Sequence, residues 1–209
     1  MISLNGIKNI IFDFGGVLFE IDYHLPVKEF AKLGFGNFAD IYTQANQNPI
    51  FDQLETGKID NESFMQYLHD FAPNVSRKAI DDAWNSILLH IMPEQVEVVH
   101  QVKEAGYRTF LLSNTNAIHV AEFEKMIADK MDINRFRSAF EKIYYSNVIG
   151  LKKPYPETYL TICDWNNLNP GETLFIDDSI QHVKGAIAAG LKAHHLQDGT
   201  RLNQVISIH

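Results

Sequence analysis

Short apolar runs that end at polar residues or glycine recur along this chain and alternate with helical patterns in its C-terminal half. Such runs are typical of strands buried on both faces of a parallel sheet. The predicted strands span Asn9–Phe12, Thr109–Leu112, Ile143–Tyr145, Thr173–Ile176 and Ala193–Leu196. The predicted helices between the later strands span Pro93–Ala105, Ile118–Met131, Pro156–Trp165 and Ile180–Ala189. This alternation predicts an α/β fold with an open parallel sheet between helical layers.

The alternation breaks once, between the first and second predicted strands. There the sequence shows helical patterns over Pro26–Leu33, Phe38–Gln47, Asp60–Phe71 and Ser76–His90. This stretch is too long for one crossover connection, so we expect a helical lobe inserted after the first strand. The expected core is residues 1–16 and 93–209, and the expected insertion is residues 17–92. The lobe is expected to lie above the strand ends.

Composition limits the classes of partner. The 209 residues carry a formal net charge of -8, which argues against a general nucleic-acid or anionic membrane surface, so an anionic substrate would need a local cation. No stretch approaches the roughly 18 apolar residues of a membrane-spanning helix, and the N-terminus lacks the pattern of a secretion signal. The single Cys163 cannot form an internal disulfide, so a reducing cytoplasm is the expected setting.

Polar side chains follow three of the predicted strands, where open α/β sheets bind their ligands. Asp13 precedes two glycines after the first strand, and Ser113 and Asn114 lie between a strand and a helix. Taken singly, these residues could simply form turns or cap helices. Asp177 and Asp178 are harder to explain by capping, because adjacent carboxylates repel each other unless protons or a cation offset their charge. A hard divalent cation such as Mg²⁺ would do so.

Lys153 is expected in the loop after the third strand, because Pro154 disfavours a helix at the residue before it. A lone loop lysine is usually solvated, but here it belongs to an ordered series. The series is a carboxylate, a hydroxyl with backbone donors, an ammonium and paired carboxylates, all at strand ends. In this order, and with the insertion after the first strand, the chain resembles the haloacid dehalogenase-like (HAD) hydrolase superfamily over nearly its whole length.

The resemblance implies a three-layer Rossmann-like core, and the 17–92 insertion looks like the helical C1-type cap of subfamily I. It implies that Asp13 is the nucleophile and that Lys153 neutralises nucleophile and phosphate. The phosphoryl oxygens would be bound by Ser113 and the backbone of Asn114. The implied Mg²⁺ ligands are Asp13, Asp178 and the Gly15 carbonyl. Asp177 would contact the ion directly or through water, and Gly15 would also contact the substrate.

These roles predict a Mg²⁺-dependent phosphomonoester hydrolase that acts on a small phosphorylated metabolite through an aspartyl-phosphate intermediate. The chemistry suits the residue types on its own terms. A carboxylate that attacks phosphorus divides hydrolysis into two easier steps, and Mg²⁺ with Lys153 would stabilise charge on the phosphoryl oxygens.

The sequence departs from the family pattern at Gly15, where most family phosphatases have a second Asp that acts as acid and then base. Three explanations stay open. The leaving group could be a better one, such as the anomeric oxygen of a sugar 1-phosphate; bacterial phosphatases of that kind also have Gly here. The acid could come from elsewhere, or activity could be lost. The alternative acids are Glu20, Asp22, which we favour weakly, His24 and the cap loop Glu55-Thr56-Gly57.

A second departure is His182, where many relatives have Asn; it is expected to change the hydrogen bonding around Ser179 and Lys153. Two other functions compete with the phosphatase. A haloacid dehalogenase would use Asp13 on carbon without metal, which leaves the Asp177–Asp178 pair unexplained. A catalytically weak binding or regulatory protein would explain Gly15, but not the retention of the other residues.

Overall fold

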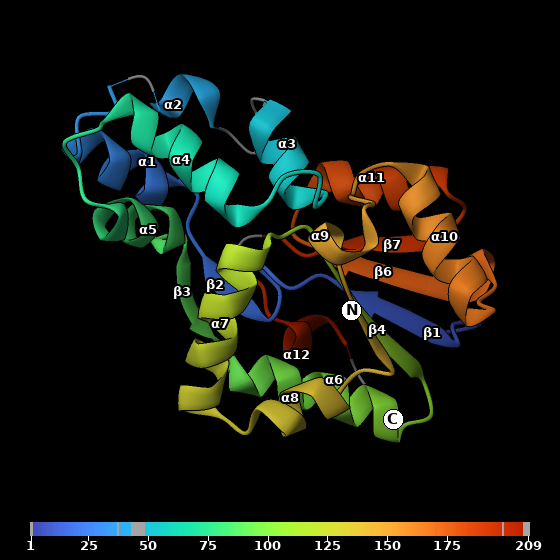
Figure 1. Cartoon of the computed structure of the whole chain (residues 1–209). Coiled ribbons are helices and arrows are strands. Elements are labelled where there is room, and N and C mark those ends of the chain that lie inside the picture. The colour runs from blue at the N-terminus through green and yellow to red at the C-terminus, as the bar shows by residue number, and fades with distance from the viewer. Residues whose placement is uncertain (1, 37, 43–48, 198, 207–209) are drawn as a thin grey trace.

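The computed structural model describes residues 2–36, 38–42, 49–197 and 199–206. Within these ranges, five parallel strands form one sheet in the order β5-β4-β1-β6-β7 (Figure 1). The strands are β1 (Asn9–Phe12), β4 (Arg108–Ser113), β5 (Lys142–Tyr145), β6 (Thr173–Asp177) and β7 (Lys192–His195). The α/β fold and the five predicted strands are confirmed. No strand end differs from the predicted bound by more than one residue.

Helices cover both faces of this sheet because successive strand residues point to opposite sides. Ile10 and Phe12 of β1 pack toward α6 (Pro93–Glu104), α8 (Ile133–Ser138) and α12 (Leu202–Val205). Ile11 packs on the other side, against α10 (Pro156–Asn166) and α11 (Ile180–Ala188). The two layers of helices are visible on either side of the sheet in Figure 1. The result is the expected three-layer core, with β1 in its centre.

The inserted segment carries its own hydrophobic cluster. Its helices are α1 (His24–Lys32), α2 (Phe38–Ile41), α3 (Pro49–Glu55), α4 (Asn61–Phe71) and α5 (Arg77–Asn85). Their buried faces meet around aromatic rings, among them Phe30, Phe51, Phe64 and Trp84. The described part of the predicted Phe38–Gln47 helix is α2, and residues 43–47 lie outside the described residues. We propose residues 17–92 as the cap.

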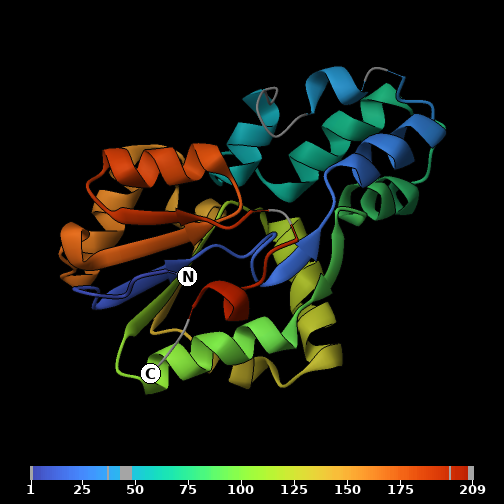
Figure 2. The same cartoon turned by 180° about the vertical axis from the view of Figure 1, so that it is seen from behind.

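A two-stranded antiparallel ribbon joins the cap to the core, and the sequence did not predict it. It pairs β2 (Phe19–Ile21) with β3 (Leu88–Ile91) (Figure 2). The predicted helix Ser76–His90 is therefore wrong at its end: α5 stops at Asn85, and the chain becomes extended from Leu88. Isolated short strands carry little periodicity, and this one exists because it pairs with a segment about 70 residues away.

Three further short or connecting helices complete the core: α7 (Ala117–Lys130), α9 (Ser146–Ile149) and the 3₁₀ turn Pro170–Glu172. Helix α7 follows β4 and contacts both β3 and α5. It therefore lies where the sheet, the ribbon and the cap meet. None of the helices in the described part of the chain is long and apolar enough to cross a membrane.

Candidate active site

A cavity lies between the carboxyl ends of the core strands and the cap. Six of the seven residues singled out from the sequence line it: Asp13, Gly15, Ser113, Asn114, Lys153 and Asp178. The seventh, Asp177, is fully buried directly beneath them. The inserted segment contributes a second group of lining residues, which includes Tyr23, Tyr42, Glu55 and Trp84. Parallel strands that end at one edge thus bring together residues up to 165 positions apart, here Asp13 and Asp178.

Lys153 is the electrostatic centre of the site. Its Nζ lies 2.6 Å from Asp13 Oδ1 and 2.7 Å from Asp177 Oδ2. The side chain is almost completely buried, which alone would lower its pKa, but the two carboxylates outweigh this effect and raise the Lys153 pKa. The lysine therefore stays an ammonium ion beside the nucleophile candidate.

Asn114 holds the backbone of that lysine. Its Oδ1 accepts a hydrogen bond from the Lys153 N–H at 2.9 Å, and its Nδ2 donates to the Lys153 carbonyl at 2.9 Å. The neighbouring loop is tied to α9, because Ser146 Oγ accepts from the Thr115 N–H at 2.9 Å. The sequence drew attention to the Asn114 backbone, but it gave no sign that the side chain pairs with a loop 39 residues later.

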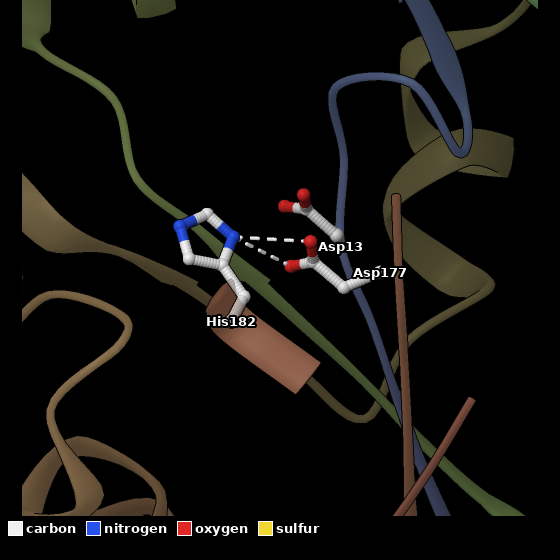
Figure 3. Close-up of side chains that lie close together, drawn as sticks. All are labelled: Asp13, Asp177 and His182. Carbon is white, nitrogen blue, oxygen red and sulfur yellow. Dashed lines mark hydrogen bonds and ion pairs between the residues drawn. The ribbon is translucent and has the colours of Figure 1, made fainter. Parts of the chain in front are cut away.

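The Asp177 carboxylate is contacted by three groups, of which Figure 3 shows the His182 ring. Besides Lys153, this carboxylate accepts from the Ser179 N–H at 2.7 Å and from His182 Nδ1, which lies 3.0 Å from both oxygens. Burial would raise the Asp177 pKa, but the Lys153 charge and the His182 hydrogen bond bring it below the ordinary value. His182 thus bonds to Asp177, whereas the sequence had pointed to effects around Ser179 and Lys153.

Asp178 lies at the cavity wall beside the loop that follows β1. A Cβ atom on Gly16, whose φ is +70°, would overlap the Asp178 carboxylate. Burial and the adjacent charge of Asp177 raise the pKa of Asp178 to about 6. Burial and Asp177 also raise the pKa of Asp13 well above its ordinary value.

The donor set fits a divalent cation. Three carboxylates, on Asp13, Asp177 and Asp178, lie close together, and the Lys153 ammonium contacts two of them. Burial and the neighbouring Asp177 charge raise the pKa values of Asp13 and Asp178, and a cation would offset this repulsion. Among the described residues, possible ligand atoms of Asp13, Asp177 and His182 lie within 4.8 Å of one another. His182 Nδ1 already donates to Asp177, however, so these two side chains form a hydrogen-bonded pair, and Asp13 and Asp178 are the better candidates for ligands.

Only one of the alternative acids named from the sequence reaches the cavity. Glu20, Asp22 and His24 are not among the residues that line it. Glu20 pairs with Arg201 at 3.0 Å, and Asp22 accepts the His24 N–H at 2.8 Å. The preference for Asp22 is therefore not supported by its position. Glu55, at the end of α3, does line the cavity.

His119 is a cavity residue that the sequence did not single out. Its Nδ1 lies 3.0 Å from Asn116 Nδ2, its Nε2 lies 3.2 Å from the Trp84 carbonyl, and its ring stacks on the Trp84 indole with centroids 4.8 Å apart. Burial lowers the His119 pKa to about 4. The available signal was its place three residues after Asn116, which caps α7 with its side chain.

A parallel sheet with carboxylates at its strand ends, under an inserted helical lobe, defines a capped α/β hydrolase. The sequence profile of the haloacid dehalogenase-like hydrolases matches residues 7–190. The chain belongs to this family and is an enzyme of it, so the resemblance inferred from the strand-end motifs is confirmed.

Phosphatases are among its relatives over nearly the full length. The chain is 27% identical to a D-ribitol-5-phosphate phosphatase of Bacteroides thetaiotaomicron, over 97% of this chain and 98% of that one. A sesquiterpene phosphatase of Aspergillus oryzae is 25% identical over 91% of this chain and 90% of that one. A crystal structure of a family enzyme from Bacteroides thetaiotaomicron, a mutant in complex with magnesium and inorganic phosphate, superposes with a TM-score of 0.85 at 31% identity, covering 95% of this chain and 98% of that one.

Proposed function

We propose that this enzyme is a Mg²⁺-dependent phosphomonoester hydrolase that acts on a small phosphorylated metabolite through an aspartyl-phosphate. The observation that carries the proposal is the 2.6 Å contact between the Asp13 carboxylate and the Lys153 ammonium at the base of the cavity. A carboxylate is a competent nucleophile toward phosphorus, and an adjacent fixed cation offsets the charge of the incoming phosphate.

In the first step, an Asp13 carboxylate oxygen forms a bond to phosphorus while the bond from phosphorus to the leaving alkoxide breaks. Lys153 and the hydroxyl and N–H groups around Ser113 and Asn114 hold the phosphoryl oxygens. The alkoxide takes up a proton from solvent. In the second step, water attacks the same phosphorus and gives a proton to solvent, and the bond to the Asp13 oxygen breaks, which releases phosphate and restores the carboxylate. Asn114 keeps Lys153 in place during both steps through its paired hydrogen bonds.

Asp13, Asp178 and the Gly15 carbonyl are the groups that would hold Mg²⁺. When bound, the ion supplies positive charge that lets phosphate approach the carboxylates. We propose that Asp177 acts indirectly, by fixing Lys153 and the start of α11, because its oxygens are already occupied.

Two substrate classes follow from different observations. The relative that hydrolyses D-ribitol 5-phosphate favours a primary phosphate of a polyol. Gly15 favours an anomeric phosphate such as a sugar 1-phosphate, because a good leaving group needs less protonation, and general acid catalysis is worth roughly 10²–10⁴-fold. Both are small hydroxylated phosphates. The buried, unpaired thiol of Cys163 fits the cytoplasm, which we propose as the compartment.

The purified enzyme should release phosphate from an aryl phosphate with Mg²⁺ and lose this activity with a chelator, and addition of Mg²⁺ should restore it. Asp13→Asn should be inactive but folded, and mass spectrometry of the quenched wild-type enzyme should find the phosphoryl group on Asp13. Turnover without metal, or by Asp13→Asn, would contradict the proposal. A panel with sugar 1-phosphates and primary polyol phosphates should then rank the two substrate classes.

The dehalogenase alternative is checked in the same assay with a 2-chloroalkanoic acid, from which we expect no chloride release. The alternative of a catalytically weak binding or regulatory protein predicts little turnover of every phosphate in the panel.

A further inference from the structure

The end of cap helix α3 is bound to the core next to the proposed catalytic lysine. Lys152 Nζ lies 2.7 Å from Glu55 Oε2 and 3.1 Å from Asp52 Oδ1. Only 14% of the Lys152 side chain and 19% of the Glu55 side chain are exposed. Burial alone would lower the Lys152 pKa, but the two carboxylates outweigh it and raise that pKa. This ion pair is therefore well shielded, unlike the exposed pairs elsewhere on the surface.

A backbone contact fixes the same junction. Gly57 has a φ of +66°, and a Cβ atom at this position would overlap the Asn147 carbonyl of α9. The preceding Thr56 is 8% exposed, and its hydroxyl donates to the Asp52 carbonyl at 2.7 Å. On the core side, Thr158 Oγ1 donates to the Lys152 carbonyl at 2.7 Å. Both partners of the ion pair thus have a fixed backbone.

Glu55 also lines the cavity above Asp13 and Lys153. The other cap residues in the cavity wall are half aromatic and half aliphatic: Tyr23, Tyr42, Trp84, Ile21, Ile87 and Leu88. Burial raises the pKa of the Tyr42 phenol, and the nearby Glu55 charge adds to this rise. A carboxylate in a salt bridge is a hydrogen-bond acceptor and not a proton donor, so its position suits recognition of hydroxyl groups better than general acid catalysis.

We propose that Glu55 is a specificity-determining residue that accepts hydrogen bonds from the hydroxyl groups of the alcohol part of the substrate, and that Lys152 is the positioning residue that holds it there. The inference rests on the proposed phosphatase function and narrows its substrates to hydroxylated phosphates. It also explains why the enzyme would discriminate against substrates with an apolar chain. Such a chain would displace water from the Glu55 carboxylate without offering a hydrogen bond in return, which is costly in a buried polar site.

The test measures kcat/KM for two substrates of equal length, ribitol 5-phosphate and pentyl phosphate. The readout is the value for ribitol 5-phosphate divided by the value for pentyl phosphate. Hydrogen bonds to charged groups contribute about 1.5–3 kcal/mol, so Glu55→Ala should lower this ratio by about 10-fold or more. Glu55→Gln, which keeps the shape of the side chain, should lower it less and guards against a folding defect. Glu62→Ala is the matched control, since Glu62 is a cap carboxylate whose side chain is 79% exposed.

Lys152→Met should lower the same ratio, mainly through a higher KM for ribitol 5-phosphate, whereas Lys78→Met, which removes an exposed cap ammonium, should leave it unchanged. Equal losses on both substrates in the folded Glu55 variants, or an unchanged ratio, would overturn the inference and leave the phosphatase function standing. A wild-type enzyme that hydrolyses neither substrate with Mg²⁺, nor an aryl phosphate, would instead overturn the proposed function and the inference with it.

Discussion

The Ile21 Cδ1 atom lies 2.7 Å from the point where a Cβ atom on Gly15 would stand. Real Cβ atoms do not approach another carbon so closely, so the place of a side chain at position 15 is filled from the ribbon strand β2. A carboxylate two residues after Asp13 would therefore require the end of the Ile21 side chain to move, in addition to the substitution itself.

Restoring that carboxylate alone should fail. Gly15→Asp is expected to lower kcat, because the new side chain must displace Ile21, while the double variant Gly15→Asp with Ile21→Ala gives the carboxylate room. On a primary alkyl phosphate, the double variant should exceed Gly15→Asp by about 10-fold or more, within the range of general acid catalysis. The single variant Ile21→Ala is the control for the effect of shortening Ile21 without adding a carboxylate. If Gly15→Asp alone matches the double variant, the space at position 15 is not what limits an acid there.

Gly16 should be essential for the metal site. Gly16→Ala places a methyl group against the Asp178 carboxylate and should weaken Mg²⁺ activation by about 10-fold or more. Gly6→Ala is the matched control, since Gly6 has a φ of +71° against +70° at Gly16, but its Cβ would meet nothing closer than Lys192 Nζ at 3.8 Å. Both variants carry the same backbone strain. Equal Mg²⁺ titrations would show that the contact with Asp178 is unimportant.

The Asn114 side chain should affect turnover through Lys153. Asn114→Ala removes both hydrogen bonds to the lysine backbone and should lower kcat by about 10–100-fold, because small displacements of a catalytic group cost that much. Asn114→Asp keeps the acceptor for the Lys153 N–H but not the donor, and should lie between Asn114→Ala and the wild type. Thermal unfolding of each variant separates this effect from a loss of fold. Wild-type kcat in Asn114→Ala would disprove the positioning role.

His119 should make stability depend on pH. Its pKa falls from 6.5 to about 4 in the folded chain, so between these values the unfolded chain binds the proton and the folded chain does not. The stabilisation of the folded chain by the neutral His119 ring is therefore complete above pH 6.5 and is lost as the pH falls toward 4. Between pH 7.5 and pH 5, the wild type should lose about 2 kcal/mol more unfolding free energy than His119→Gln.

Urea unfolding at the two pH values measures this difference. His90→Gln, which alters an exposed histidine on β3, should keep the wild-type pH dependence. Identical pH dependence in His119→Gln and the wild type would mean that His119 is not kept neutral by burial. A neutral ring is what its hydrogen bonds require, since Nδ1 accepts from Asn116 while Nε2 donates to the Trp84 carbonyl.

The sequence predicted the core well because its strands are buried on both faces and end at polar residues, which is a local pattern. The same pattern predicts that Asp13, Ser113, Lys153 and Asp178 lie at one edge of the sheet. The ribbon β2–β3 was missed because its strands are stabilised by each other and not by local preference. The α3 helix was also missed, although Pro49 at its start and the spacing of Phe51 and Leu54 were available signals.

Contacts between distant segments had no signal in one sequence. The pairing of Asn114 with the Lys153 backbone, the Ile21 side chain beside Gly15 and the engagement of Asp177 by His182 all depend on packing. For this reason the residue types of the site could be predicted, whereas the partner of each side chain could not.

Lys152 and Lys153 are consecutive, yet one binds the cap and the other binds the base of the sheet. A shift of this loop by one residue would exchange the two ammonium groups and damage both contacts at once. An insertion or deletion in this loop would therefore disturb substrate recognition and turnover together. We expect new specificities in this lineage to arise by substitutions in the cap, while the length of this loop stays constant.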